Sequence, residues 1–275
     1  MTAVKKRAHQ LARSLGFDVV RYPPSTSRPE PPATPSAQSS PQPSTASLTY
    51  TEQWSDLAGI LRRLSIDHVI DVGANMGQYA KELRGLGYQG PIDSYEPVIA
   101  AYNLAARDAA ADDLWTVTNC AIGSVEGEVT INVAANKSQS SSILPMLARH
   151  EEAAPHAKYI GEQTVAVRTL DEVAGQVAAG TTAFLKVDTQ GFEREVLAGA
   201  GALLAGPVAA IQIELSMVPL YAGGPLYPEI FDALHASGFR LTHVIAGYVD
   251  PATGEMLQFD GIFVRDIEGT ITTAT

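Results

Sequence analysis

The chain has 275 residues, of which 45% are hydrophobic and 18% are charged, the balance of a globular protein. The net charge of −11 argues against a nucleic-acid partner, because clustered lysines and arginines bind phosphate backbones. A single cysteine, Cys120, excludes an internal disulfide and a cysteine-based zinc site. No apolar run reaches the roughly 18 residues that a spanning helix needs, so we expect a cytoplasmic protein.

Residues 1–22 carry five lysines and arginines against one acid, Asp18. Apolar residues recur at helical spacing, which predicts a basic amphipathic helix. Its polar face could attach weakly to an anionic membrane surface, peripherally at the inner membrane. A solvated or packed helix is the favoured alternative, because the apolar face is narrow. Residues 23–47 contain eight prolines and predict a disordered Pro/Ser-rich linker, followed by one domain at 48–275.

Strands and helices alternate through the predicted domain. We expect helices at 51–64, 77–86, 98–110, 193–197 and 228–236. We expect strands at 68–72, 91–95, 115–119, 127–134, 164–170, 183–188, 208–215, 239–244 and 258–264. Continuous apolar strands that alternate with helices are typical of an α/β protein with a mainly parallel, doubly wound sheet. Such sheets bind ligands at the carboxyl ends of their strands.

The first predicted strand runs into a glycine turn within VIDVGANMGQYA, residues 69–80. Dinucleotide sites use G-x-G-x-x-G, but here Asn75 replaces the middle glycine, and no P-loop lysine follows. Asp71 before the turn would repel a phosphate. S-adenosylmethionine fits better, because Asp71 can orient its ammonium and the amides after Gly73 can face its carboxylate. We assign cofactor contacts here to Asp71, Gly73, Ala74, Asn75, Gly77, Gln78 and Tyr79.

The second strand ends at Glu96, which lies 23 residues after Gly73. At this offset an acid accepts hydrogen bonds from both ribose hydroxyls, in NAD enzymes as well, so Glu96 alone does not identify the nucleotide. After the third strand, we expect Asn119, Cys120 and Ala121 beside the adenine. Cys120 could equally be a small residue of the core.

Together these segments resemble the FkbM family of S-adenosylmethionine-dependent methyltransferases. The resemblance covers about residues 57–266 and rests on VIDVGANMGQYA, SYEP, CAIGSVEG, SQSSSI, VRTLDEV, FLKVDTQGFEREVLAGA, IQIELSMVPLY and DGIFVR. It implies a Rossmann-like class I methyltransferase fold with an antiparallel late strand. It also implies O-methylation, commonly of a sugar hydroxyl in a glycolipid, polysaccharide or glycosylated natural product. At Gln190 the family more often has an acid.

A sugar hydroxyl is a weak nucleophile and needs a base or a cation to take up or acidify its proton. Asp188 and Glu214 end the fourth and fifth strands, where they could hold Mg²⁺ between them. Alternatively Asp188, which we also expect to contact the cofactor, or His243 accepts the proton directly. Glu214 could instead bind neighbouring loop amides. The loop PLYAGGPLY, residues 219–227, is either a flexible sugar platform or a packed loop.

Two other classes of function remain open at this point. A nicotinamide-dependent sugar oxidoreductase or epimerase is disfavoured by the missing G-x-G-x-x-G and by the lack of a clear Tyr-x-x-x-Lys pair. A non-catalytic adaptor tethered to a membrane by its basic N-terminus would have no cofactor site.

Overall fold

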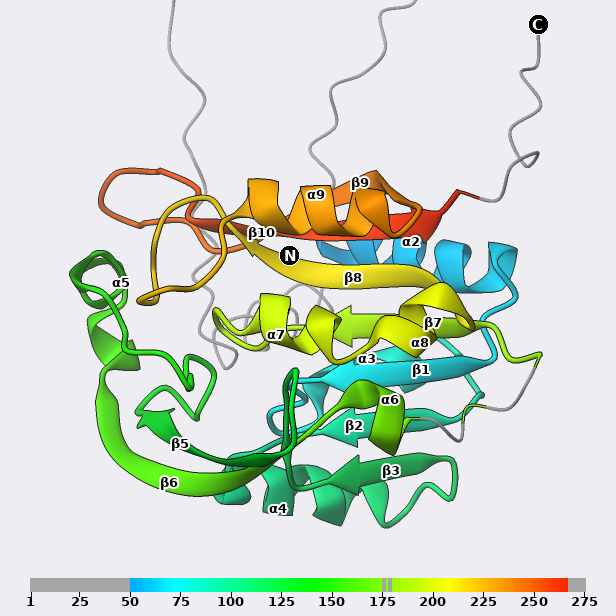
Figure 1. The fold of residues 1–275 in the computed structure, drawn as a ribbon, viewed down its shortest axis with the longest axis horizontal. Helices are drawn as coiled ribbons and strands as arrows, with labels where there is room; N and C mark the ends of the chain where they lie inside the picture. The colour runs from blue at the N-terminus through cyan, green and yellow to red at the C-terminus, as the bar shows by residue number, and fades with distance from the viewer. Residues whose placement is uncertain (1–49, 175–176, 178–179, 267–275) are drawn as a thin grey trace, which may run out of the picture. The chain divides into compact units, whose positions relative to one another are not determined.

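The structure is a computed structural model, and it describes residues 50–174, 177 and 180–266 (Figure 1). The predicted N-terminal helix at 1–22, the linker at 23–47 and the domain boundary at residue 48 lie outside the described residues. Among the residues described, none of the helices combines the length and the apolarity that a membrane crossing requires.

The central element is a seven-stranded sheet in the described part of the chain, with the order β3-β2-β1-β7-β8-β10-β9. In that order the strands are Trp115–Thr118, Ile92–Tyr95, His68–Val72, Ala183–Val187, Val208–Ser216, Gln258–Arg265 and Phe239–Ala246. β10 pairs antiparallel with both β8 and β9, whereas the other ladders are parallel. The predicted α/β fold with an antiparallel late strand is confirmed.

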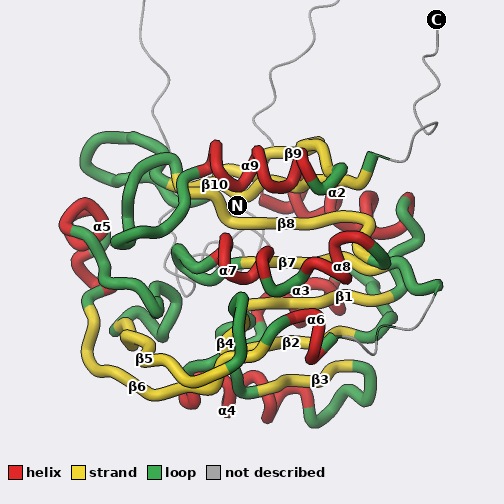
Figure 2. The backbone as a smooth tube through the Cα atoms, in the orientation of Figure 1, coloured by secondary structure: helices red, strands yellow, loops and turns green. Residues whose placement is uncertain are grey.

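Helices cover both faces of this sheet (Figures 1 and 2). On one face lie α2, α3 and α4, at Tyr50–Arg63, Gln78–Gly85 and Ile99–Ala109. On the other face lie α6, α7, α8 and α9, at Leu170–Val173, Glu193–Ala198, Gly201–Ala205 and Tyr227–Ala236. Successive strand residues alternate between the two faces, so Val69 joins the core under the first set of helices and Ile70 joins the core under the second.

A smaller three-stranded sheet has the order β4-β6-β5 and is formed by Ala121–Ile122, Tyr159–Arg168 and Gly127–Ala134. The segment between β5 and β6 carries the serine loop, α5 at Ala148–Ala153 and a 3-10 turn at Pro155–Ala157. The sequence did not predict the first half of β6, because its side chains are mostly exposed and give no apolar alternation. β4, α5, α6 and α8 are too short to leave a periodic pattern.

Candidate functional site

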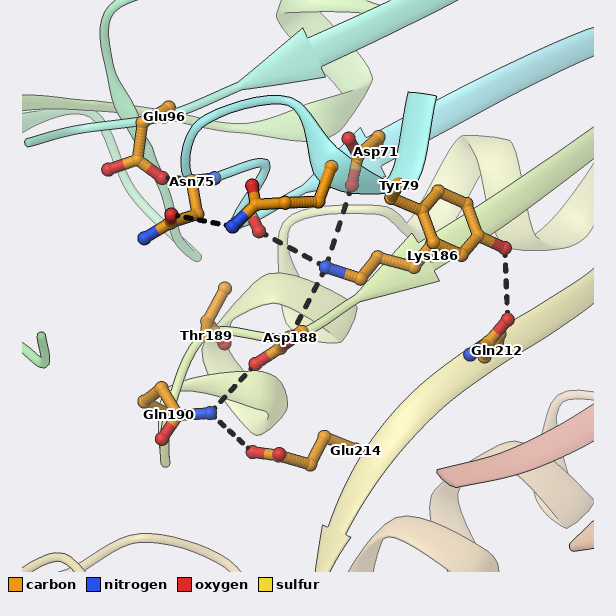
Figure 3. Close-up of polar contacts among 12 residues, drawn as sticks. Asp71, Asn75, Tyr79, Glu96, Lys186, Asp188, Thr189, Gln190, Gln212 and Glu214 are labelled. Atoms are coloured by element: carbon orange, nitrogen blue, oxygen red, sulfur yellow. Dashed lines mark hydrogen bonds and ion pairs between the residues drawn. The ribbon is translucent and has the colours of Figure 1, made fainter. Parts of the chain in front are cut away.

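Two rows of polar residues cross the α2–α4 face of the sheet. The register of β2, β1, β7 and β8 aligns an inner row of Ser94, Asp71, Lys186 and Gln212. Two residues further along each strand, and therefore on the same face, comes an outer row at the carboxyl ends. This outer row consists of Glu96, Gly73, Asp188 and Glu214, and Asp260 of β10 lies opposite Glu214. Figure 3 shows most of these side chains.

The inner row is a buried ionic network centred on Lys186. Its Nζ lies 3.5 Å from Asp71 Oδ1 and 3.5 Å from Asp188 Oδ2, and it donates to the Gly73 carbonyl at 3.1 Å. Asp71, which is fully buried, also accepts a hydrogen bond from Ser94 Oγ at 3.1 Å. Burial by itself lowers the pKa of Lys186, but Asp188 and the other nearby carboxylates raise it above its ordinary value. Lys186 is therefore charged and links the two rows.

Tyr79 belongs to this buried layer rather than to the turn. Its hydroxyl donates to Gln212 Oε1 at 2.9 Å, and its ring lies 5.6 Å from Lys186 Nζ. Only 7% of the residue is exposed. Any contact between Tyr79 and the cofactor therefore has to involve its backbone.

The glycine turn after β1 has a backbone that larger residues could not adopt. Gly73 has a φ of 79°, and a Cβ atom there would lie 1.8 Å from the Asp188 carbonyl oxygen. Gly77 has a φ of 73°, and a Cβ atom would lie 2.5 Å from the Trp115 ring. Both glycines are thus required by conformation and by space. Gly73 in particular lets the β1 and β7 turns touch.

Several amides of this turn make hydrogen bonds within the protein. The N–H groups of Gly73 and Ala74 donate to the Tyr95 carbonyl at 3.0 and 3.1 Å, and that of Gly77 donates to the Ala74 carbonyl. The Asn75 N–H donates to Glu96 Oε2 at 2.8 Å. These four amides have partners within the protein, and the expected contact between the amides after Gly73 and the cofactor carboxylate remains a prediction.

The same turn offers acceptors that suit a cationic group. Asp71 Oδ1 and Gln78 Oε1 are buried and have no hydrogen-bond partner within the described ranges. Gln78 is oriented by its own Nε2, which donates to Asn75 Oδ1 at 3.1 Å. Asp71 Oδ1 still has the Lys186 ammonium 3.5 Å away, so Gln78 Oε1 is the acceptor here that lacks a partner. Buried acceptors are normally satisfied, so Gln78 Oε1, next to the negative charge of Asp71, fits the ammonium of S-adenosylmethionine.

Glu96 is 5% exposed and is held by two backbone amides, those of Asn75 and Val98, at 2.8 Å each. Burial raises the pKa of Glu96 to about 7, although these two amides oppose the shift. A carboxylate has about four acceptor positions, so two remain for the ribose hydroxyls that we expect. Asn119 supports this loop by donating to the carbonyls of Glu96 and Pro97 at 2.8 and 2.9 Å.

The expected adenine contacts remain a prediction. Asn119 is exposed, whereas Cys120 and Ala121 are 3% and 4% exposed and lie in the hydrophobic core. Burial raises the pKa of the Cys120 thiol to about 11, so it is a protonated, small apolar residue.

The turn after β7 is held by Glu193, which is 4% exposed. Its Oε1 accepts the Thr189 amide at 3.0 Å and the Thr189 hydroxyl at 3.1 Å, and its carboxylate accepts the Gly191 amide at 3.1 Å. Gln190 has a φ of 55°, and Gly191 has a φ of 99°. Glu193 therefore fixes a strained turn that directs the Gln190 side chain.

Gln190 connects the two predicted catalytic acids (Figure 3). Its Nε2 donates to Asp188 Oδ1 at 2.8 Å and to Glu214 Oε2 at 2.7 Å. Glu214 Oε2 also accepts Gln258 Nε2 at 2.6 Å. Burial, followed by the charge of Asp188, raises the pKa of Glu214 well above its ordinary value. The Asp188 side chain remains 36% exposed.

The expected magnesium site does not fit these contacts. An amide N–H donor lies between Asp188 and Glu214, where a shared cation would have to lie. In the part of the chain that the structure describes, no group of three or more His, Cys, Asp or Glu side chains could hold a metal ion. The residues of this site do not fit a Mg²⁺ ion.

His243 is also not brought to this site. It lies on the edge strand β9 opposite Ile262 of β10, and β10 separates β9 from Glu214 on β8. Its Nδ1 contacts the Thr242 hydroxyl at 2.9 Å. Two strand spacings are about 10 Å, too far for His243 to share a proton with Asp188 or Glu214. Its assignment as an alternative base is corrected.

The loop 219–227 is packed at Tyr221 rather than open. Tyr221 is 2% exposed, and its hydroxyl donates to Gln190 Oε1 at 2.6 Å. A Cβ atom on Gly191 would lie 2.9 Å from the Tyr221 side chain. Of the two interpretations of this loop, the structure supports the packed one for Tyr221.

Sequence reasoning missed Lys186 and Asp260. Asp260 is hydrogen-bonded to Gln212, and its pKa is raised to about 7 by burial and by Asp188, while Lys186 opposes the shift. A signal for both was present, because Lys186 interrupts the otherwise apolar strand β7 and Asp260 interrupts the apolar residues in the middle of β10. A charged residue in a buried strand requires a partner of opposite charge.

A protein-family model matches a large part of this chain. Residues 71–241, which are more than half of the chain, match the methyltransferase FkbM domain. A search among curated proteins returned no significant match.

Several solved structures are similar to this chain at low identity and low TM-score. Fibrillarin from Aeropyrum pernix with bound S-adenosyl-L-methionine has a TM-score of 0.44 at 10% identity, covering 78% of this chain and 74% of its own. The magnesium protoporphyrin IX methyltransferase of Synechocystis PCC 6803 has a TM-score of 0.42 at 10% identity, with 78% and 79% covered. Precorrin-6y C5,15-methyltransferase from Geobacter metallireducens has a TM-score of 0.41 at 9% identity, with 81% and 93% covered.

Proposed function

Because the chain belongs to the methyltransferase FkbM domain family and uses S-adenosylmethionine, we propose that it methylates a hydroxyl oxygen of a sugar. The acceptor that we propose is a glycolipid, a polysaccharide or a glycosylated natural product. The observation that carries this proposal is the outer row, where partly exposed Asp188 stands beside Glu214 at the carboxyl ends of adjacent strands.

In this proposal the turn after β1 holds the cofactor. Asp71 and Gln78 offer buried acceptors for its ammonium, and Glu96 offers acceptors for the ribose hydroxyls. When bound, S-adenosylmethionine supplies a methyl group that is already activated on a sulfonium. The protein then has mainly to align the acceptor oxygen and to receive its proton.

Asp188 is the group that we propose receives this proton. Its carboxylate is reachable from solvent, whereas the pKa of Glu214 is raised by burial, so Glu214 is the weaker candidate for an ionised base. The Lys186 ammonium lies 3.5 Å from Asp188 Oδ2 and holds this carboxyl group at the end of β7. Glu214 assists by accepting or donating a hydrogen bond to a neighbouring hydroxyl of the acceptor.

The class of acceptor is supported by the polar groups near Asp188. Carboxylates and amides, among them Glu214, Gln190 and Gln258, lie within hydrogen-bond distance of one another. Such groups suit a neutral polyol. The carboxyl groups of Asp71, Asp188, Glu214 and Asp260 all surround the Lys186 ammonium. This surplus of acidic groups disfavours an acceptor with a phosphate at the reacting end.

Transfer from a labelled methyl donor tests this proposal. The wild-type protein is incubated with glycan and lipid extracts of its host, and labelled products are fragmented to locate the methyl group. We expect O-methyl sugars with the wild type and none above background with Asp188→Asn. Label on nitrogen, on carbon or on nucleic acid, with none on a sugar oxygen, would overturn the proposed acceptor.

A further inference from the structure

The side chain of Gln190 occupies an unusual position, because a single nitrogen contacts two carboxylates. Its Nε2 lies 2.8 Å from Asp188 Oδ1 and 2.7 Å from Glu214 Oε2. A primary amide carries two N–H groups on that nitrogen, so one can donate to each acid. The amide therefore joins the ends of β7 and β8.

The orientation of this amide is determined by its surroundings. Gln190 Oε1 accepts the Tyr221 hydroxyl at 2.6 Å, and a flipped amide would instead direct Oε1 at two carboxylates. The backbone is fixed as well, since the Ser142 hydroxyl donates to the Gln190 carbonyl at 2.7 Å. Gln190 is 8% exposed, so solvent does not compete freely for these bonds. These contacts fix the Gln190 amide as a bridge between Asp188 and Glu214.

Two carboxylates this close repel each other unless something lies between them. The usual solutions are a shared proton or a divalent cation with oxygen ligands. Here an uncharged amide donates to both acids, and Lys186 lies 3.5 Å from Asp188 Oδ2. Burial and the charge of Asp188 also raise the pKa of Glu214. The Gln190 amide supplies the bridge between the two acids and the Lys186 ammonium supplies the positive charge. A bridging metal ion would supply both from a single position.

We propose that the Gln190 amide replaces a bridging cation in this site, so that Asp188 and Glu214 are paired and work without a divalent metal. Gln190 is then a positioning residue, which acts through the two acids. This inference rests on the proposed function only where it refers to methyl transfer. The absence of a cation site in the wild type, and its creation by substitution, can be tested without any acceptor.

The substitution Gln190→Glu gives the first test. It places a third carboxylate where the amide now stands, and three oxygen donors around one point suit Mg²⁺. We expect Mg²⁺ to raise the thermal midpoint of Gln190→Glu by about 2 °C or more and to leave that of the wild type unchanged. The control Gln139→Glu adds the same charge at an exposed position, so it should not respond. No response of Gln190→Glu, or an equal response of the wild type, would overturn the proposal.

Turnover gives the second test, which also covers the case that Gln190→Glu does not fold. Wild-type turnover should stay within about twofold after chelation and after addition of Mg²⁺. Gln190→Met removes both donors at similar side-chain length, and we expect kcat to fall about tenfold while the Kd for S-adenosylmethionine changes less than about twofold. The control Gln258→Met removes one donor to Glu214 but leaves the bridge, so its loss should be smaller.

The two proposals fail in different ways. Wild-type turnover that is lost on chelation and restored by Mg²⁺ would overturn the inference about Gln190, as would normal kcat in Gln190→Met. A protein that binds S-adenosylmethionine but labels no sugar oxygen would overturn the proposed acceptor. It would leave the thermal test of Gln190→Glu valid.

Discussion

The turns after the neighbouring strands β1 and β7 are built alike. Each contains a polar residue with a positive φ, which is Asn75 at 48° in the first and Gln190 at 55° in the second. Each is held by a buried glutamate that accepts backbone amides, namely Glu96 in the first and Glu193 in the second.

The two turns differ in which side chain is left for function. Glu96 comes from the end of β2 and keeps free acceptor positions. The functional side chain at the first turn is therefore supplied by the neighbouring strand. Glu193 comes from the start of α7 and serves the turn itself, and the second turn presents its own residue, Gln190. One backbone geometry thus supports a binding role in one place and the positioning of catalytic acids in the other.

The contact between the two turns can be broken at Gly73. Gly73→Ala would place a Cβ atom 1.8 Å from the Asp188 carbonyl oxygen at a φ of 79°. We expect the free energy of unfolding to fall by about 3 kcal/mol or more. Gly85→Ala, at the end of α3, meets nothing within 4 Å and serves as the control. Chemical denaturation measures both, and a Gly73→Ala protein as stable as the control would refute the close contact.

The binding role of the first turn can be weakened at Glu96. Glu96→Ala should lose about 1–3 kcal/mol of cofactor affinity, the range for hydrogen bonds to a charged group. Calorimetry with S-adenosylmethionine measures this loss, and circular dichroism checks the fold. Unchanged affinity would mean that Glu96 only closes the turn.

The pH dependence of binding sharpens the same assignment. Burial raises the pKa of Glu96 to about 7, and only the ionised form accepts hydrogen bonds at every oxygen position. Cofactor affinity should therefore rise by up to roughly tenfold between pH 6 and pH 8. Glu96→Gln should flatten this rise, and a wild type with affinity independent of pH would contradict the assignment.

The stability of the unliganded protein should change in the opposite direction. A carboxyl with a raised pKa in the folded state stabilises the fold below its unfolded pKa, and this contribution is lost as pH rises through about 7. The thermal midpoint should thus decrease between pH 5 and pH 8, less steeply in Glu96→Gln than in the wild type. If the thermal midpoints of the two proteins decreased equally with pH, a group other than Glu96 would be responsible for the decrease.

The smallest expected effect concerns residues outside both turns. A chain that starts at Ala46 should bind S-adenosylmethionine with a Kd within about twofold of the full-length value, because the proposed cofactor contacts all follow it. Liposome flotation of both proteins tests the proposed membrane contact of residues 1–22. Equal flotation would end that proposal, and a loss of cofactor binding would show that these residues contribute to the site.

The first turn could be predicted from sequence because its signals are local. Gly73, Gly77 and Glu96 stand at spacings that reflect backbone geometry. The strand at 68–72 was predicted to the residue, since three of its four buried side chains are apolar. The hydrogen bonds of the Gly73 and Ala74 amides were not predicted, because their partner Tyr95 comes from the next strand.

The second turn could not be predicted in the same way. The role of Gln190 depends on Tyr221, Glu214 and Ser142, which lie 31, 24 and 48 residues away. Nothing in the local pattern indicates which of these long-range contacts will form. His243 was misplaced for a related reason, since the strand order that puts β10 between β8 and β9 is a property of the whole sheet.

The central claim is that the first turn binds the cofactor and the second turn carries out the chemistry. The most direct test measures kcat and the Kd for S-adenosylmethionine in Asp188→Asn and in Glu96→Ala. We predict that Asp188→Asn lowers kcat by about a hundredfold or more with little change in Kd. Glu96→Ala should instead weaken Kd and retain most of kcat at saturating cofactor. Near-normal turnover of Asp188→Asn, with an intact fold and a saturated cofactor site, would contradict the account.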